Sequence, residues 1–165
     1  MKNFVKAITL LAFAAAVAAS CAGAPKTSGE QAAVTDFSAV RDRDWDLAEI
    51  RTGQKRIVID FGEEWDEEGS EKFFTLRFDA EQISGVGAPN RYRAPYSTGD
   101  NNAVSIGLIA GTLMAPLREP EVLKEQEYFA LLQKAVRWNL VREYLELYCE
   151  NASGGETVLV FAPAE

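Results

Sequence analysis

Histidine is absent from the 165-residue chain, which removes the side chain that most often serves as a general base. Its absence also excludes Ser-His and Cys-His nucleophile pairs and most zinc sites, which draw on imidazole ligands. Cys149 and the acidic run 63–71 are the remaining candidates for catalysis and metal binding, and a simpler role is favoured for each. We therefore predict a protein that is not an enzyme and that carries no metal and no cofactor.

Cysteine is scarce as well, with Cys21 and Cys149 as the two thiols. Cys149 stands in a run of alternating apolar residues, where a lone cysteine is usually a small buried hydrophobe rather than a nucleophile. If Cys21 carries lipid, Cys149 has no disulfide partner. The folded part must then be stabilised by a hydrophobic core, and the apolar share of 47% is ordinary for one globular domain.

Basic residues are outnumbered, because 17 lysines and arginines face 25 aspartates and glutamates, for a formal net charge of -8. Nucleic-acid binding is not expected, since neutralising phosphates requires a basic surface. An acidic surface instead favours solubility and basic partners.

The first 21 residues have the order of an export signal. Lys2 and Lys6 are positively charged, residues 8 to 16 are apolar, and small residues come directly before Cys21. This arrangement resembles the bacterial lipobox, so we predict a signal peptide at 1–20 and lipid attachment at Cys21. A plain secretory signal and an uncleaved anchor are the competing interpretations.

The predicted domain organisation follows from this signal. Residues 21–36, rich in Ala, Ser, Gly and Lys, show no periodicity and are predicted to be a flexible tether. A single domain is expected at 37–163. The protein is expected in the bacterial cell envelope, held at a membrane by its lipid anchor.

Turn residues punctuate residues 78 to 116, where Gly, Pro and Asn separate short apolar runs. Residues 91 to 97 alternate there, with Tyr92 and Ala94 on one face. Upstream, residues 45 to 50, 57 to 61 and 73 to 78 also alternate, and the acidic run between the last two is expected to be a long hairpin tip. Five or six strands before residue 112 with no helical stretch predict an antiparallel sheet that curls on itself.

The order and spacing of these pieces resemble the META domain (HslJ-like) family. The matching pieces, in chain order, are Trp45-x-Leu47, Phe78, Ile83-Ser84-Gly85, Asn90-Arg91-Tyr92, Tyr96, Ile109, Thr112-x-Met114-Ala115, Glu127, Leu131, Leu145-x-Leu147 and Val158-Leu159-Val160-Phe161. Pro89 and Pro116 stand where many relatives have cysteines, so a cross-link between those loops is absent. The resemblance implies a mainly β fold with one helix, a curled antiparallel sheet or incomplete barrel. Related proteins are compared in fold with secretion pilot lipoproteins, whose incomplete barrels accept lipid.

The C-terminal third is ambiguous from periodicity. A helix is expected from about Pro120 to Ala135, with Glu121 and Glu125 near its start suiting the helix dipole. Its apolar stripe consists of Tyr128, Leu131, Leu132 and Ala135, and Tyr144 and Tyr148 would extend that stripe as far as Cys149. Alternation within the same residues fits two strands instead. Periodicity alone slightly favours the long helix, whereas the family resemblance favours strands over residues 136 to 162.

Candidate binding residues come from two places. Trp65 lies in the acidic run 63–71, where a large aromatic could anchor a partner and the carboxylates could chelate calcium, although a solvated loop is the favoured interpretation. Family signature residues Asn90, Arg91, Tyr92 and Tyr96 could form a recognition patch, but a structural role is favoured. Thr112 and Met114 are interpreted as core and turn residues.

These observations lead to two functional hypotheses. The first is a non-catalytic envelope protein that binds a protein partner or an apolar ligand in a stress-related or secretion-assisting role, as the resemblance implies. The second is an acidic inhibitor of a basic hydrolase such as lysozyme. A pocket lined by aromatic side chains would support the first, and a protruding acidic loop the second.

Overall fold

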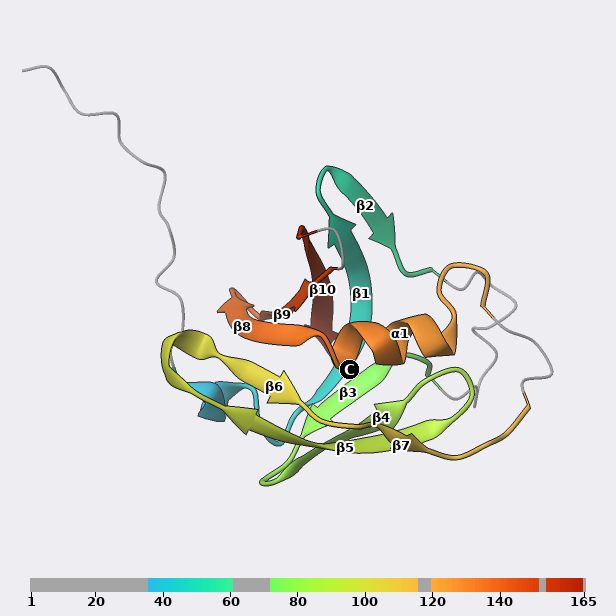
Figure 1. Cartoon of the computed structure of the whole chain (residues 1–165), viewed down its shortest axis with the longest axis horizontal. Coiled ribbons are helices and arrows are strands. Elements are labelled where there is room, and N and C mark those ends of the chain that lie inside the picture. Colours follow the sequence, from blue (N-terminus) through green and yellow to red (C-terminus); the bar gives the residue numbers. More distant parts are fainter. Residues whose placement is uncertain (1–35, 61–71, 116–119, 152–153, 165) are drawn as a thin grey trace, which may run out of the picture. The chain divides into compact units, whose positions relative to one another are not determined.

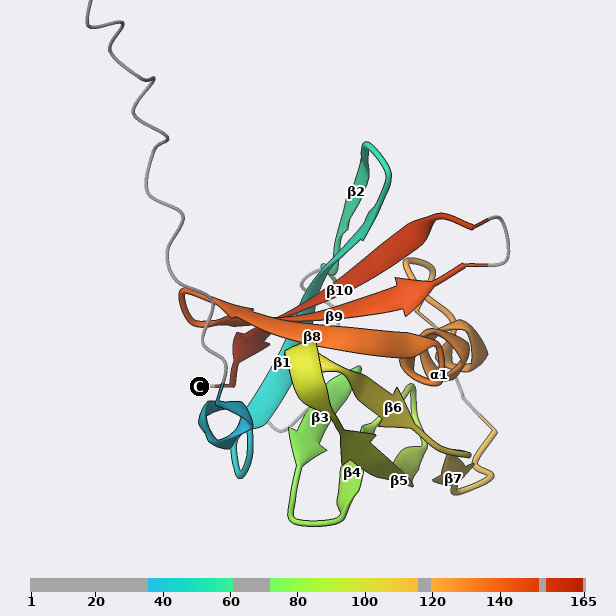
Figure 2. The same ribbon diagram turned by 60° about the vertical axis from the view of Figure 1, so that its left-hand side comes forward.

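The computed structural model of the chain describes residues 36–60, 72–115, 120–151 and 154–164, all within one compact unit, Gln31–Glu165. The described residues form a mostly β unit with one α-helix (Figures 1 and 2). The elements, in chain order, are the 3-10 helix η1 (Phe37–Ala39), β1 (Asp44–Thr52), β2 (Lys55–Val58), β3 (Thr75–Phe78), β4 (Gln82–Val86), β5 (Arg91–Thr98), the 3-10 helix η3 (Asp100–Asn102), β6 (Val104–Ile106), β7 (Ala110–Gly111), α1 (Glu125–Leu132), β8 (Ala135–Val141), β9 (Tyr144–Glu150) and β10 (Glu156–Pro163). None of the helices in the described ranges combines the length and apolar character needed to span a bilayer.

The strands form one antiparallel sheet in the order β6-β5-β4-β3-β1-β10-β9-β8, with β2 added to β1 and β7 added to β5. The two ends of this order, β6 and β8, come together, and a single bridge between Ala103 and Arg137 joins the chain there. The sheet is therefore nearly closed into a barrel with one unsealed seam. This confirms the predicted incomplete barrel.

Alternating side chains fill the inside of the barrel. In β5 the buried residues are Tyr92 and Ala94, while Arg91, Arg93 and Pro95 face outward, as the alternation predicts. Trp45 and Trp138 are among the largest fully buried side chains. The interior is thus packed by aromatic and aliphatic groups contributed by strands on both sides of the seam.

The two helices that cover the barrel lie at opposite ends of it, as Figure 2 shows. In η1, the ring of Phe37 contacts those of Phe78, Tyr96 and Trp138, with centroid distances of 5.1, 5.7 and 5.0 Å. At the other end, Tyr128 of α1 is fully buried. Each helix therefore covers core residues that the sheet alone would leave exposed.

Residues 136 to 162 are strands wherever the structure describes them, apart from the turns that join them, which confirms the choice against a long helix. Val141 pairs with Tyr144, so Arg142 and Glu143 form a two-residue turn, and Arg142 has a φ of 60°. A positive φ is incompatible with a continuing right-handed helix. The apolar residues that extended the helical stripe instead alternate across β8 and β9.

The expected start of the helix is wrong by about one turn. The helix begins at Glu125, after Lys124 in an extended conformation, and not at Pro120. Glu127 marks this start because its carboxylate accepts a hydrogen bond from the Lys124 backbone N–H at 3.2 Å. The acidic residues of the first turn, Glu125 and Glu127, also suit the helix dipole.

The connection from β2 to β3 also differs from the expected hairpin. Both strands pair with β1. Strand β2 pairs with residues 49–52, near the end of β1, and β3 pairs with residues 44–46, near its start, while β10 occupies the other edge of β1. Among the described residues, β2 and β3 therefore follow one another along the same edge of β1 and do not pair together. The acidic run 63–71 lies outside the described residues. Among the described residues, seven strands precede residue 112, one or two more than expected, because a two-residue strand, β7, also pairs with β5.

Candidate functional site

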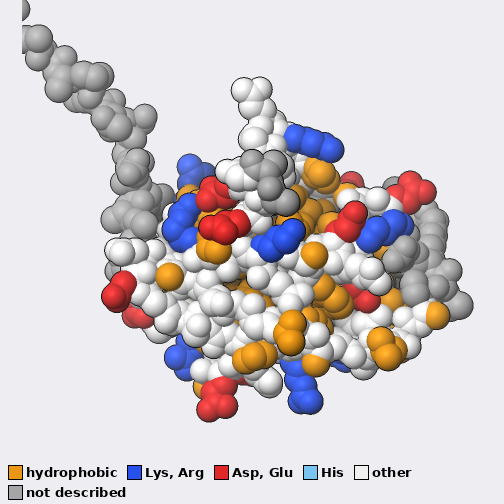
Figure 3. Space-filling view, viewed as in Figure 1, with side chains coloured by type: hydrophobic (Ala, Val, Ile, Leu, Met, Phe, Trp, Pro, Cys, Tyr) orange, Lys and Arg blue, Asp and Glu red, His pale blue; other side chains and the backbone are white. Residues whose placement is uncertain are grey.

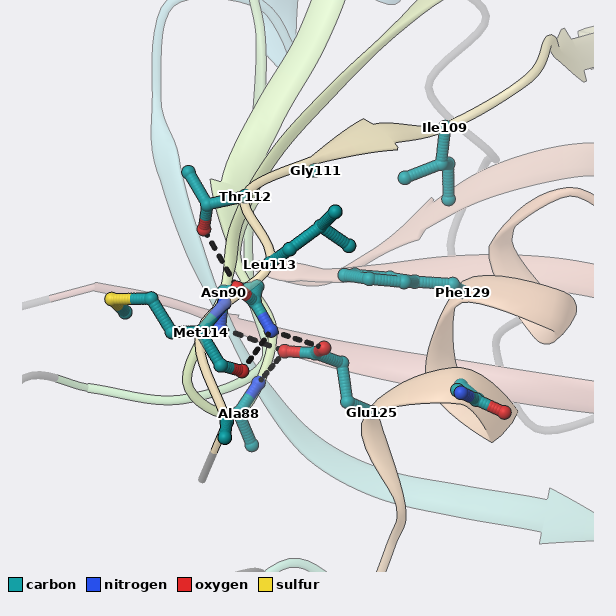
Figure 4. A pocket seen from close by; sticks show the side chains of 11 residues that line it. Ala88, Asn90, Ile109, Gly111, Thr112, Leu113, Met114, Glu125 and Phe129 are labelled. Atoms are coloured by element: carbon teal, nitrogen blue, oxygen red, sulfur yellow. Dashed lines mark hydrogen bonds between the residues drawn. The ribbon is translucent and has the colours of Figure 1, made fainter. Parts of the chain in front are cut away.

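The candidate site lies where three segments meet: the turn before β5, the segment after β7 and the first turn of α1 (Figure 4). The side-chain oxygen of Asn90 accepts hydrogen bonds from the Thr112 hydroxyl at 2.8 Å and from the Met114 backbone N–H at 2.7 Å. Its amide nitrogen donates to the Met114 carbonyl at 3.2 Å. One buried asparagine thus fixes the chain that leaves β7.

Glu125 joins the same turn to the helix. Its Oε2 accepts hydrogen bonds from the backbone N–H groups of Ala88 and Asn90, both at 2.7 Å. Its Oε1 accepts from the Asn90 amide at 2.8 Å. We call these contacts of Asn90 and Glu125 the Asn90–Glu125 network. The carboxylate of Glu125 accepts all three of these bonds, so they are charge-assisted.

Gly87 makes room for this network. A Cβ at that position would lie 2.6 Å from Oε2 of Glu125 and 2.8 Å from the ring of Phe129. A side chain there would push the helix away from the turn. The approach of α1 to the sheet therefore depends on glycine at this position.

Above the network lies a groove of about 490 Å³, whose lining includes Ile109, Leu113, Met114 and Phe129. We call it the Phe129 groove. Figure 4 shows Ile109, Leu113 and Phe129 arranged around open space, with Asn90 and Glu125 at one side. Leu113 is fully exposed and Met114 is 52% exposed, so apolar side chains stand in water at its rim.

A family model for the META domain matches residues 38–165 of the chain. The chain belongs to the META domain family. Search of curated proteins found no match.

Two solved structures share the fold of this META domain. The NMR structure of a protein from Burkholderia xenovorans is 18% identical, with 86% of this chain and 97% of that chain covered and a TM-score of 0.58. A DUF4847 family protein from Bacteroides vulgatus is 14% identical, with 76% and 95% covered and a TM-score of 0.50. At these identities the likeness extends to the fold alone.

The META signature Asn90-Arg91-Tyr92 does not form one surface patch. Asn90 is buried in the network described above, and Tyr92 is buried in the barrel on the face opposite Arg91. The Tyr92 hydroxyl donates to the Thr75 carbonyl at 2.8 Å and lies 3.1 Å from the hydroxyl of Tyr128. Burial raises the pKa of both phenols, so they remain neutral hydrogen-bonding groups. These contacts agree with the structural roles favoured for Asn90 and Tyr92.

The other predicted site residues are Tyr96, Cys21 and Trp65. Tyr96 is half-buried and donates its hydroxyl to the Asp79 carbonyl at 2.7 Å, at the barrel end that Phe37 covers. Burial is also the main cause that raises the pKa of Tyr96. Cys21 and Trp65 lie outside the described residues.

Sequence reasoning missed the residues that form the groove. Thr112 and Met114 are interpreted as core and turn residues; both are exposed, in a segment without regular secondary structure, so neither belongs to the core. Phe129 lies beside the predicted helical stripe of Tyr128 and Leu132. An aromatic residue outside that stripe was the available sequence signal for an apolar surface on the helix. The sequence assigns Glu125 only to the helix dipole.

Two further predictions concern chemistry. Cys149 is buried and free, and burial raises its pKa to about 12, as expected for a cysteine that packs as a small hydrophobe. Within the described ranges, no group of three or more His, Cys, Asp or Glu side chains is placed to hold a metal ion. The acidic run considered for calcium is not part of those ranges.

Proposed function

We propose that this META domain is a lipid-anchored envelope protein that binds an apolar ligand in the Phe129 groove without catalysing a reaction. The observation that carries the proposal is the pairing of an exposed apolar rim with a rigid base. Leu113 and Met114 are exposed beside Phe129, while the Asn90–Glu125 network holds the surrounding backbone in place. Fixing the site before binding lowers the entropy lost on binding.

The size and lining of the groove favour an alkyl or acyl chain as the ligand. A volume of about 490 Å³ falls in the range of small-molecule sites. Apolar surface is contributed by Ile109, Leu113, Met114 and Phe129, and polar groups come mainly from the Asn90–Glu125 network, which already uses them internally. A ligand here would therefore be held by apolar contact rather than by hydrogen bonds.

A neutral fluorescent probe tests this function without involving charge. N-Phenyl-1-naphthylamine should bind the full chain and brighten, and Leu113→Asp should weaken binding by about tenfold, because burying one leucine contributes roughly 1.5 to 3 kcal/mol. Leu108→Asp is the matched control, since Leu108 is an 83% exposed leucine on the segment between β6 and β7 and does not line the groove. Equal affinity for the two variants would contradict the assignment.

Envelope anchoring is tested separately. Cys21→Ser should release the protein from the membrane fraction, and the mass of the wild-type chain should include acyl groups at Cys21. A stress-related or secretion-assisting role would follow from delivering or sensing the bound ligand at that membrane. A wild-type chain that starts elsewhere and lacks lipid would overturn the anchoring, but not the binding.

A further inference from the structure

A second recess lies on the outer face of the sheet, away from the core. Its walls are the β1–β2 hairpin, which projects from the barrel in Figures 1 and 2, and the turn between β8 and β9. Its volume is about 500 Å³. Paired strands place Glu49, Val160 and Glu146 side by side at its base, because Val160 is opposite both glutamates in the register.

Both glutamates at the base are buried although they face outward from the barrel. The side chains of Glu49 and Glu146 are 5% and 9% exposed. Arg51 donates from Nε to Glu49 and from Nη1 to Glu146, the latter at 2.8 Å. Arg56 donates from Nε to the second oxygen of Glu49, and the Tyr148 hydroxyl donates to Glu146 at 2.6 Å. Every carboxylate oxygen of this pair is therefore already bonded within the chain.

These contacts keep Glu49 charged. Burial opposes the ionised form of Glu49, but the hydrogen bonds and positive charges of Arg51 and Arg56 outweigh it and lower the pKa of Glu49. In turn, the bond to Glu49 is the largest cause that raises the pKa of Arg51. The two carboxylates thus hold two guanidinium groups in fixed positions.

The arginines retain hydrogen-bonding capacity toward the recess. A guanidinium has five N–H donors, and the bonds above use two from Arg51 and one from Arg56. Their side chains are 45% and 68% exposed. Arg142 adds a third guanidinium from the β8–β9 turn, and it has no ion-pair partner among the residues that the structure describes. The lining carries three guanidinium groups and two carboxylates, a local positive excess in a chain of net charge -8.

Exposed apolar side chains border the same recess. Val58 on one wall is 57% exposed, and Val141 and Tyr144 on the other are 39% and 40% exposed. In Figure 3, hydrophobic, basic and acidic side chains gather together on the face below the projecting hairpin. A ligand suited to this surface has one anionic group and an apolar part.

We propose that this arginine recess, formed by Arg51, Arg56 and Arg142 around Glu49 and Glu146, binds a carboxylate or phosphate group that carries a short apolar chain. The anion contacts the free guanidinium N–H groups, as arginine forks suit its planar or tetrahedral oxygens. The apolar chain lies against Val58, Val141 and Tyr144. A cation is excluded by the excess positive charge and by carboxylates whose oxygens are all bonded.

The test is an NMR titration of the 15N-labelled full chain with hexyl phosphate. Amide shifts are expected at Ala48, Val58, Val141 and Tyr144. Inorganic phosphate should bind more weakly, because it lacks the apolar part, and neutral hexanol should leave these amides unchanged. Dihexanoyl phosphatidic acid distinguishes the source of the anion: tighter binding than hexyl phosphate identifies a lipid headgroup, and weaker binding identifies a free metabolite-sized ligand.

Arg142→Asn is the decisive variant, because the side chain is exposed and asparagine tolerates the positive φ at this turn. It should weaken hexyl phosphate binding by about tenfold, the loss expected when one charge-assisted contact is removed. Arg93→Gln is the matched control, because Arg93 is an exposed arginine on β5, outside the recess, and its affinity should equal that of the wild type. Equal binding by Arg142→Asn and wild type, equal shifts with hexanol, or shifts confined to other amides would overturn the proposal.

Discussion

Exchanging the amide at position 90 and the carboxylate at position 125 gives the sharpest test of the role of the Asn90–Glu125 network. Glu125→Gln keeps one oxygen for the backbone N–H groups of Ala88 and Asn90 but places an amide N–H₂ against the amide of Asn90. Asn90→Asp instead places two carboxylates against each other. In the double variant, the new amide at position 125 faces the new carboxylate at position 90, so a donor again meets an acceptor.

The structure sets the expected sizes of these effects. Glu125→Gln removes one charge-assisted bond, worth about 2 kcal/mol. Asn90→Asp places a second carboxylate beside that of Glu125, where the amide nitrogen of Asn90 lies 2.8 Å from Oε1 of Glu125 in the wild type. The expected loss of unfolding free energy is at least about 3 kcal/mol. Additive effects would destabilise the double variant by about 5 kcal/mol. Because the exchange restores the contact, we expect a loss of no more than about 3 kcal/mol, a coupling of about 2 kcal/mol.

Urea unfolding followed by tryptophan fluorescence measures these free energies, since Trp45 and Trp138 are buried and report on the core. Glu127→Gln provides the control, because this exposed carboxylate lies in the same helical turn and its described hydrogen bond is the one to the Lys124 N–H. A change below about 0.5 kcal/mol is expected for the control. Additive single and double variants, or a Glu125→Gln effect no larger than that of the control, would refute the network as a stabilising unit.

Two further predictions concern the barrel interior. Gly85→Ala should destabilise by about 3 kcal/mol in urea unfolding, because its Cβ would lie 2.1 Å from the Thr75 carbonyl oxygen, whereas Gly99→Ala should be nearly neutral with 3.5 Å to its nearest neighbour. For Cys149, burial raises the pKa from 9.0 to about 12, so the unfolded chain releases this proton first and the free energy of unfolding should fall as pH rises above 9. Cys149→Ala should reduce that fall between pH 8 and 10, and an unchanged pH dependence would show that the thiol does not contribute.

The strands could be predicted because their evidence is local. Alternation such as that of Tyr92 and Ala94 in β5 appears within a few residues, and the structure preserves it. The ambiguity after Ala135 was also local, because apolar residues there satisfied both periods. What decided it physically was the two-residue turn at Arg142, which pairs Val141 with Tyr144.

The candidate site could not be predicted in the same way. Asn90 bonds to Met114 and Glu125, which are 24 and 35 residues away in the chain, and no local pattern links such positions. The family signature identified Asn90 as important without saying what it contacts. Phe129 and Leu113 line a groove only because that network brings α1 to the segment after β7.

Glu49 shows how a correct strand prediction can still misjudge an environment. Strict period two in β1 would place Glu49 on the same face as Trp45 and Leu47, yet Glu49 faces outward and is only 4% exposed. The register shifts between Leu47 and Glu49, and the β1–β2 hairpin then forms one wall of a recess over this face. An outward-facing carboxylate in such a recess must be paired, and Arg51 and Arg56 on the same hairpin supply the partners. Period two distinguishes the two faces of a strand but does not reveal a bulge or a recess over the outer face, so a charged residue interpreted as solvated can instead form the buried base of a recess.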